Sequence, residues 1–188
     1  MAKVTCIIGE PCVGKSLVIR ELMRLDTWNY NPVKWTPHHS AQTRNGRSVI
    51  LGRYDDAGHK YPGTDRLSMA VQQHAFNYIE EVSPWGTNIL FEGDRLGNWE
   101  FIWALHNMHM RTEVDFKLIH LWLRPEFLAK RRAEQRPDQN AKFWASRKTK
   151  IDNIMKKVRK SSIAYKSIEH VNLGDTHNLI AHLRKERI

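Results

Sequence analysis

Residues 9–16, GEPCVGKS, place two glycines, a lysine and a serine at the spacing G-x-x-x-x-G-K-[ST]. An apolar run precedes them and predicts a buried strand, and the apolar residues that follow recur at helical spacing. A glycine-rich loop between a strand and a helix can point several backbone N–H groups at one phosphate chain. In such a loop Lys15 reaches the β- and γ-phosphates, and the Ser16 hydroxyl binds Mg²⁺. The predicted ATP-binding residues are Gly9, Glu10, Pro11, Cys12, Val13, Gly14, Lys15, Ser16 and Leu17, with a catalytic role for Lys15 as well.

A second set of chemically useful side chains, Glu92, Asp94 and Arg95, follows the apolar run 88–91. We predict a buried strand there, and ligands of α/β proteins bind at the carboxyl ends of the strands. The two carboxylates would then face the same crevice as the glycine-rich loop. One could hold Mg²⁺ together with Ser16, and the other could accept the proton of a hydroxyl, with the assignment open. Arg95 would contact a phosphate or substrate, or hold one of the acids in place.

Positive charge is concentrated in one segment of the chain. The formal net charge is +10, and residues 124–160 hold 13 basic and 4 acidic residues. Residues 1–110 have no net charge. A concentrated basic patch indicates a polyanionic partner, either a triphosphate or a nucleic acid. A solvated basic surface is the alternative interpretation.

The elements that must position these residues alternate between strand and helix. This pattern predicts an α/β protein with a mainly parallel sheet and helices on both faces, and the motif at 9–16 adds the P-loop NTPase fold. We expect one domain, residues 1–188. Strands are predicted at 3–8, 32–35, 47–54, 87–92, 116–123 and 168–173, with a turn at 43–46. Helices are predicted at 15–25, 65–82 with Thr64 as N-cap, 96–108, 125–136, 141–160 and 176–187.

Composition limits the setting of the protein. The two cysteines cannot form a disulfide framework, and this favours a reducing, intracellular environment. No apolar run approaches the length that spans a membrane, and no signal peptide precedes the first strand. We therefore expect a cytoplasmic protein that does not enter a membrane. The oligomeric state stays open.

The basic segment resembles the lid of the nucleoside and nucleotide monophosphate kinases. Two helices, rich in arginine, flank the polar break PDQN at 137–140. In that family lid arginines close on the triphosphate and neutralise charge on the transferred group, and closure excludes water. The resemblance implies an arginine-rich helical lid at about 124–150, with catalytic roles for Arg131, Arg132 and Arg136, and spacing alone does not say which of them acts.

Two further segments carry a narrower resemblance. YPGTDRLSMAVQ (61–72) together with LFEGDRL (90–96) resembles the bacteriophage 5-hydroxymethyluracil DNA kinases. The resemblance implies transfer of the ATP γ-phosphate to the hydroxymethyl group of the base within double-stranded DNA, during thymine hypermodification. The host cell cytoplasm would be its location. Asp65, Glu92 or Asp94 could accept the alcohol proton. Asp65 and Arg66 would contact the substrate, although a helix-capping aspartate and a solvated arginine explain them equally well.

Cations and rings continue beyond the part that a lid requires, in a mixture typical of nucleic-acid-binding surfaces. These residues are Lys142, Phe143, Trp144, Lys148, Lys156, Lys157, Arg159, Lys160, Tyr165 and Lys166. Three other hypotheses stay open beside the DNA-base kinase. They are a small-molecule nucleoside or nucleotide kinase, a 5′-hydroxyl polynucleotide kinase and a DNA-stimulated P-loop ATPase that phosphorylates nothing.

Overall fold

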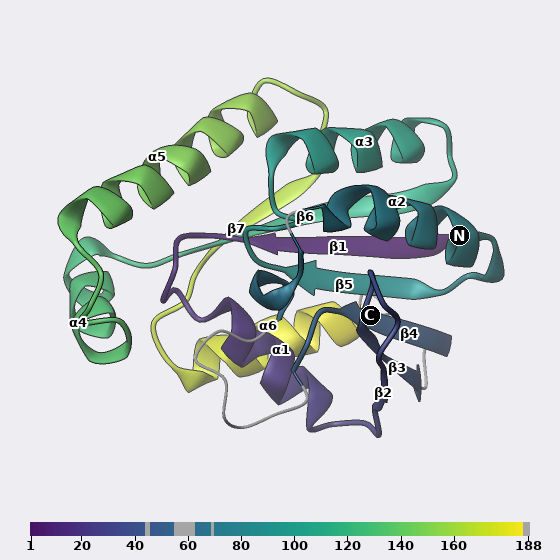
Figure 1. Cartoon of the computed structure of the whole chain (residues 1–188), viewed down its shortest axis with the longest axis horizontal. Helices are drawn as coiled ribbons and strands as arrows, with labels where there is room; N and C mark the ends of the chain where they lie inside the picture. The colour runs from purple at the N-terminus through teal and green to yellow at the C-terminus, as the bar shows by residue number, and fades with distance from the viewer. Residues whose placement is uncertain (44–45, 55–62, 69, 186–188) are drawn as a thin grey trace.

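The computed structural model describes residues 1–43, 46–54, 63–68 and 70–185, and within them the strands form one seven-stranded sheet (Figure 1). The strand order is β2-β3-β4-β5-β1-β6-β7. Neighbours from β4 to β7 are parallel, whereas β2, β3 and β4 pair antiparallel at one edge. The predicted α/β class with a mainly parallel sheet is thus confirmed. The strands are β1 (Ala2–Ile8), β2 (Asn29–Asn31), β3 (His38–Thr43), β4 (Gly46–Leu51), β5 (Asn88–Glu92), β6 (Val114–Trp122) and β7 (Tyr165–Glu169).

Strand β1 occupies the interior of the sheet because its side chains are apolar on both faces. Cys6 is fully buried in the core on one face, and Ile7 is fully buried in the core on the other. A parallel strand that is covered on both faces gives a continuous apolar run, and this is why it is recognisable in the sequence. Its parallel neighbour β5 pairs Glu92 with Ile7, so that the acid-ended strand finishes beside the start of the glycine-rich loop.

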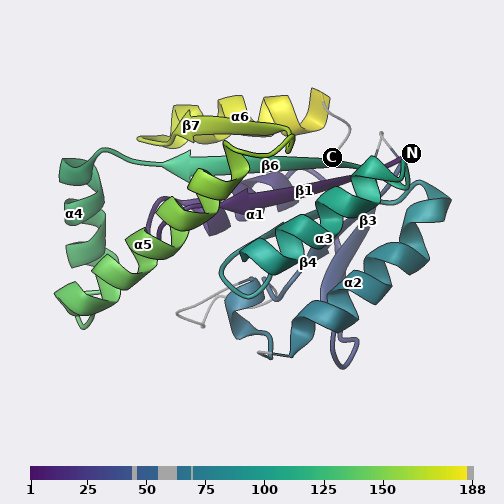
Figure 2. The same cartoon turned by 90° about the horizontal axis from the view of Figure 1, so that it is seen from above.

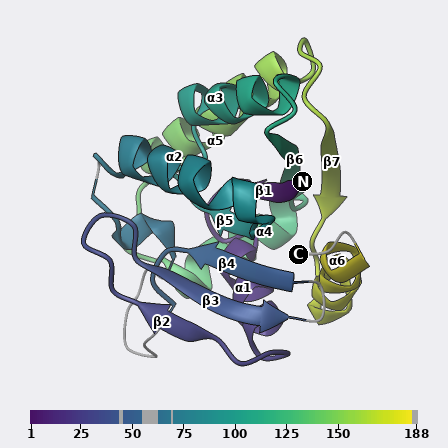
Figure 3. The same ribbon diagram turned by 90° about the vertical axis from the view of Figure 1, so that its right-hand side faces the viewer.

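Helices cover both faces of this sheet, as the prediction required (Figure 3). Helices α2 (Val71–Val82), α3 (Trp99–Met110) and α5 (Ala141–Val158) pack on the face of Cys6. Helices α1 (Lys15–Met23) and α6 (Leu173–Lys185) pack on the face of Ile7. Helix α4 (Pro125–Gln135) and the first half of α5 extend past the carboxyl ends of the strands (Figures 1 and 2). We call residues 124–150 the lid.

Most predicted elements are present with ends shifted by a few residues. Within the described part of the chain, no helix has both the length and the apolar character needed to cross a membrane. Two of the predicted strands were misplaced. Residues 32–35 are irregular, because Pro32 lacks an N–H and the Val33 N–H donates to the Asn31 carbonyl in a turn, and the strand is β3 instead. The last strand begins and ends earlier than predicted, at Tyr165–Glu169.

The predicted helix 65–82 was wrong in its first turns. Residues Thr64–Arg66 form the short 3₁₀ helix η1, and α2 begins only at Val71. Thr64 does not cap a helix with its side chain: its hydroxyl donates to the Glu92 carbonyl, and the N-cap of η1 is Gly63. The hydrogen-bonding capacity of the segment is therefore directed at the end of β5. Residues 44 and 45 of the predicted turn, and residue 69, lie outside the described residues, as does the end of the predicted helix 176–187.

His170, just after β7, fixes the glycine-rich loop to the rest of the sheet. Its side chain is fully buried, and Nδ1 lies 2.7 Å from the Val13 carbonyl oxygen. Because a carbonyl only accepts, Nδ1 carries the hydrogen. Nε2 lies 2.7 Å from the Thr176 hydroxyl, in α6. Burial lowers the pKa of His170, against the opposing effect of its hydrogen bond to Val13. The folded protein thus holds this ring neutral.

We expect His170→Asn to weaken the pH dependence of folding. An unfolded histidine gains a proton below about pH 6.5, whereas the folded ring resists it, so this group lowers the unfolding free energy as pH falls. One such proton is worth at most about 1.4 kcal/mol per pH unit. Asparagine keeps an N–H near Nδ1 and does not titrate. Urea unfolding at pH 7, 6 and 5 should show the wild type losing more stability than the variant on acidification. Parallel curves would contradict the role of His170.

Candidate active site

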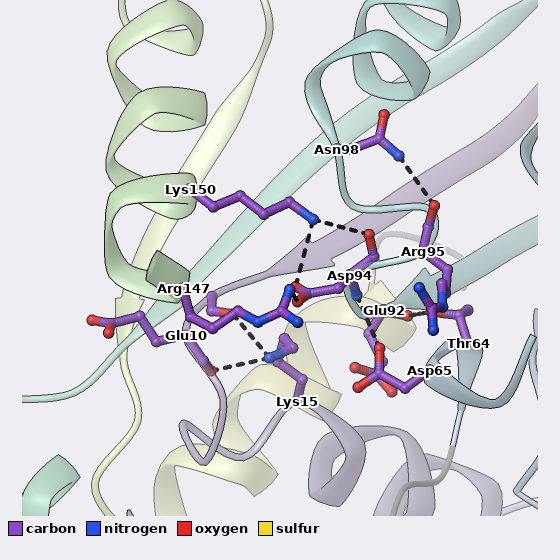
Figure 4. Close-up of polar contacts among 11 residues, drawn as sticks. Glu10, Lys15, Thr64, Asp65, Glu92, Asp94, Arg95, Asn98, Arg147 and Lys150 are labelled. Atoms are coloured by element: carbon purple, nitrogen blue, oxygen red, sulfur yellow. Dashed lines mark hydrogen bonds and ion pairs between the residues drawn. The ribbon is translucent and has the colours of Figure 1, made fainter. Parts of the chain in front are cut away.

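The glycine-rich loop between β1 and α1 has the backbone that its sequence requires. Gly9 and Gly14 have φ angles of 154° and 100°, and Cys12 also has a positive φ of 70°. A Cβ atom on Gly14 would lie 2.4 Å from Cε1 of His170, so the loop could not pack there with another residue. The Lys15 ammonium donates to the carbonyls of Gly9 and Glu10, at 2.9 and 3.0 Å. Lys15 is thereby held across the mouth of the loop (Figure 4).

Glu92 is the buried acid of the site. Its residue is 2% exposed, and its Oε1 accepts hydrogen bonds from the Ser16 hydroxyl at 3.1 Å and the Tyr54 hydroxyl at 2.9 Å. Burial raises the pKa of Glu92 to about 7, with the nearby Asp65 acting in the same direction, while Lys15 and the two hydroxyls oppose the rise. A serine hydroxyl beside a carboxylate supplies the oxygen ligands that Mg²⁺ prefers. The chemistry of this pair therefore fits the predicted metal site.

Asp94 lies at the same end of β5 and contacts α5 of the lid. The Arg147 guanidinium donates to Asp94 Oδ2 at 2.5 Å. Lys150 lies 4.0 Å from Asp94 Oδ1 and donates to the Asp94 carbonyl at 3.1 Å. Figure 4 shows both cations reaching from the helix toward the loop. The carboxylate of Asp94 is thus tied to the lid, whereas that of Glu92 is tied to Ser16, directly after the glycine-rich loop.

Asp65 joins η1 to the loop after β5. Its Oδ1 accepts a hydrogen bond from the Asp94 backbone N–H at 3.1 Å. The side chain is half-buried and lines the same cavity as Lys15 and Glu92. Arg95 lines that cavity too, and its carbonyl accepts from the Asn98 side chain at 3.0 Å (Figure 4). The side chain of Arg66, also predicted to contact substrate, lies outside what the structure describes.

A cavity of about 690 Å³ brings the site together. This volume lies within the usual range of small-molecule pockets. The predicted site residues that line it are Pro11, Cys12, Gly14, Lys15, Ser16, Leu17, Asp65, Glu92, Asp94, Arg95, Arg131 and Arg136. Gly9, Glu10, Val13 and Arg132 were predicted as well and do not line it. Cys12 is half-buried, and burial raises the pKa of its thiol.

The lid arginines differ in what they contact. Arg131 donates to the carbonyls of Val13 and Val171, at 3.3 and 2.6 Å. It thus contacts the glycine-rich loop while lining the cavity. Arg132 turns to the Glu10 carboxylate at 2.5 Å and lies over the Trp144 ring, 4.5 Å from its centroid. Arg136 lines the cavity.

Sequence reasoning did not assign a site role to several residues of the cavity. Arg147 stands over the Phe143 ring, 5.1 Å from its centroid, one helical turn along α5. This i, i+4 spacing of a ring and a cation was the available signal. Tyr54 carried no such signal, because only the fold brings it to Glu92. The cavity-lining residues that were not predicted for the site are Arg20, Gln135, Gln139, Phe143 and Arg147.

No family model matches the chain, and none of the curated proteins matches it. Among solved structures, an uncharacterized protein from Eubacterium ventriosum is similar to it, with 14% identity, coverage of 100% of this chain and 98% of that one, and a TM-score of 0.48. Shikimate kinase from Bacteroides thetaiotaomicron is similar with 13% identity, 97% coverage of each chain and a TM-score of 0.40. Neither likeness assigns a role to a residue of this chain.

We expect Glu92→Gln to stabilise the fold at alkaline pH. With a pKa of about 7 in the fold against 4.5 for an ordinary glutamate, the unfolded chain loses this proton first as pH rises. The wild type therefore loses stability between about pH 4.5 and 7, by at most ~3 kcal/mol from this group. Glutamine does not titrate.

Urea unfolding at pH 5 and pH 8 measures this effect. The stability of Glu92→Gln relative to the wild type should rise between the two pH values. Glu134→Gln, at an exposed position of α4, is the control and should show no such rise. If the difference in unfolding free energy between Glu92→Gln and the wild type were the same at both pH values, the raised pKa of Glu92 would be contradicted.

Proposed function

We propose that the protein transfers the γ-phosphate of ATP to an alcohol hydroxyl, with the 5-hydroxymethyl group of 5-hydroxymethyluracil in double-stranded DNA as acceptor. One observation carries the proposal. A single cavity is lined by Lys15 and Ser16 of the glycine-rich motif, by the carboxylates of Asp65, Glu92 and Asp94, and by cations of the lid. Phosphoryl transfer is mostly a matter of positioning and of charge stabilisation, and this cavity offers both.

We assign ATP to the glycine-rich loop, called the phosphate loop from here on, and the metal ion to Ser16 and Glu92. The Lys15 ammonium has three N–H donors. Two of them bond to loop carbonyls, and the third can donate to a phosphate oxygen. Ser16 and Glu92 would hold Mg²⁺, which supplies neutralisation of the phosphate charge. Arg131, Arg136 and Arg147, from the lid, line the same cavity, where they can stabilise charge on the transferred group.

The acceptor would react by displacement at the γ-phosphorus. Its alcohol oxygen forms a bond to phosphorus, the bond from phosphorus to the bridging oxygen of ADP breaks, and the alcohol proton passes to a carboxylate. We propose Asp65 for the proton. All three carboxylates line the cavity, but Asp94 is paired with Arg147 and Glu92 is engaged by two hydroxyls, whereas Asp65 accepts a hydrogen bond from a backbone N–H.

The choice of a DNA base as acceptor rests on the resemblance of two segments, and the fold supports it by joining them. Thr64 and Asp65, in the first segment, bond to the backbone of Glu92 and Asp94, in the second. Both segments line the cavity beside the phosphate loop. A base in duplex DNA would leave the stack to enter this cavity, at a cost of a few kcal/mol. The net charge of +10 favours a polyanionic acceptor.

Transfer of labelled γ-phosphate tests the acceptor. We expect label on closed circular DNA that contains 5-hydroxymethyluracil, and none on ordinary linear DNA with 5′-hydroxyl ends or on free nucleosides and monophosphates. Lys15→Ala should abolish the transfer. Label on linear DNA alone would indicate a polynucleotide kinase, label on free nucleotides a small-molecule kinase, and ADP release without label a DNA-stimulated ATPase. Each of these results would overturn the proposal.

Steady-state kinetics test the general base. We expect Asp65→Asn to lower kcat by roughly 10²–10⁴-fold with little change in KM for ATP, because the amide still accepts the Asp94 N–H but cannot take a proton. Asp94→Asn is the comparison variant and should lose less, since its carboxylate already pairs with Arg147. A larger loss in Asp94→Asn than in Asp65→Asn would assign the proton to the other acid.

A further inference from the structure

The surface where α3 meets α5 carries an aromatic pair that does not line the cavity. Trp99 and Trp103, one turn apart on α3, stack with ring centroids 5.4 Å apart and an interplanar angle of 25°. Trp99 is partly buried against the core, but Trp103 is 41% exposed. The Lys157 ammonium, from α5, lies 5.0 Å from the centroid of the Trp99 ring. We call Trp99, Trp103 and Lys157 the tryptophan platform.

The platform follows the cavity residues Asp94 and Arg95 closely along the chain. Asp94 and Arg95 line the cavity, and the chain reaches Trp99 five residues after Asp94, a span of at most about 17 Å. Lys150, which donates to the Asp94 carbonyl, stands two turns before Lys157 on the same side of α5. Figure 2 shows α3 and α5 on one face of the sheet. One side of α5 therefore carries a lysine that contacts the cavity residue Asp94 and a lysine that stands over Trp99 of the platform.

The charge of this surface selects the kind of partner. Helix α5 contains six basic residues and one acidic residue, and the acidic one, Asp152, is already paired with Lys148. Rings that offer a face, next to cations at intervals along a helix, match a nucleic-acid strand, whose bases stack while its phosphates are neutralised. A second protein copy would have to bury the same lysines without an acid from this helix to pair them.

We propose that the tryptophan platform binds the acceptor DNA strand beside the reacting nucleotide, with a flanking base on Trp103 and a phosphate near Lys157. The inference rests on the proposed function, since it gives the acceptor its path into the cavity. It also accounts for a base outside the stack. When one nucleotide leaves the helix, its neighbour loses a stacking partner, and an exposed indole ring replaces that partner.

Fluorescence anisotropy with a labelled 20-base-pair duplex, containing either one 5-hydroxymethyluracil or thymine, tests the platform. We expect Trp103→Ala to weaken binding of the modified duplex roughly tenfold or more, and Trp103→Phe to retain most of it. Lys157→Gln should lower the slope of log affinity against log salt by about one. Trp85→Ala, a 79% exposed tryptophan in the 3₁₀ helix η2 (Ser83–Trp85), and Lys185→Gln, exposed on α6, are the matched controls.

The possible outcomes distinguish a failure of the platform proposal from a failure of the proposed function. If the wild type phosphorylates the modified DNA but Trp103→Ala and Lys157→Gln bind it like their controls, the platform is wrong and the function stands. If the wild type binds DNA through the platform but transfers no label, the platform stands and the kinase activity on DNA is wrong. No DNA binding by the wild type overturns both. A change from dimer to monomer in Trp103→Ala, without loss of DNA binding, would show that a second copy covers the surface.

Discussion

The buried carboxylate of Glu92 is the constraint on which the arrangement of the site depends. An ionisable group out of contact with water has to be compensated by hydrogen bonds or by opposite charge. Two hydroxyls, from Ser16 in the phosphate loop and Tyr54 after β4, converge on the same oxygen. Gly63 has to lack a side chain, because a Cβ atom there would lie 2.3 Å from that oxygen. One side chain thus fixes four segments of the chain to one another.

The lid is held over the cavity by pairing of its cations with groups of the site. Arg147 pairs with Asp94, Arg132 pairs with Glu10, and Arg131 donates to the Val13 carbonyl. Such charge-assisted hydrogen bonds are stronger than neutral ones. In the first two pairs both partners are ionised, and in the third only the arginine is. If the proposed triphosphate occupied the cavity, it would compete for the same guanidinium groups. Binding of the triphosphate would then be coupled to the position of the lid through these charges.

Local chemistry decided which parts of this molecule could be predicted from the sequence. The glycine-rich loop and its flanking strand and helix depend on residues that are neighbours in the chain, and the structure has this strand, loop and helix. Thr64, Asp65 and Arg132 have partners 28, 29 and 122 positions away. A threonine followed by an aspartate also favours a helix N-terminus, and only the tertiary partner at the end of β5 draws both side chains elsewhere. Tyr54 reaches Glu92 for the same long-range reason.

The aromatic rings of the basic segment have a different role in the fold from the one that the sequence indicates. Phe143 and Trp144, read in sequence among lysines and arginines, indicate base stacking. In the fold Arg147 and Arg132 already stand over these two rings, so they orient the cations of the lid. A ring face covered by a guanidinium cannot receive a base. Trp103 comes from α3, outside the basic segment. It stacks on Trp99, and the His106 ring lies tilted beside it with centroids 5.2 Å apart, yet 41% of the residue stays exposed. Exposure, which no composition reveals, is what separates a ring that positions an arginine from one that can stack on a nucleotide.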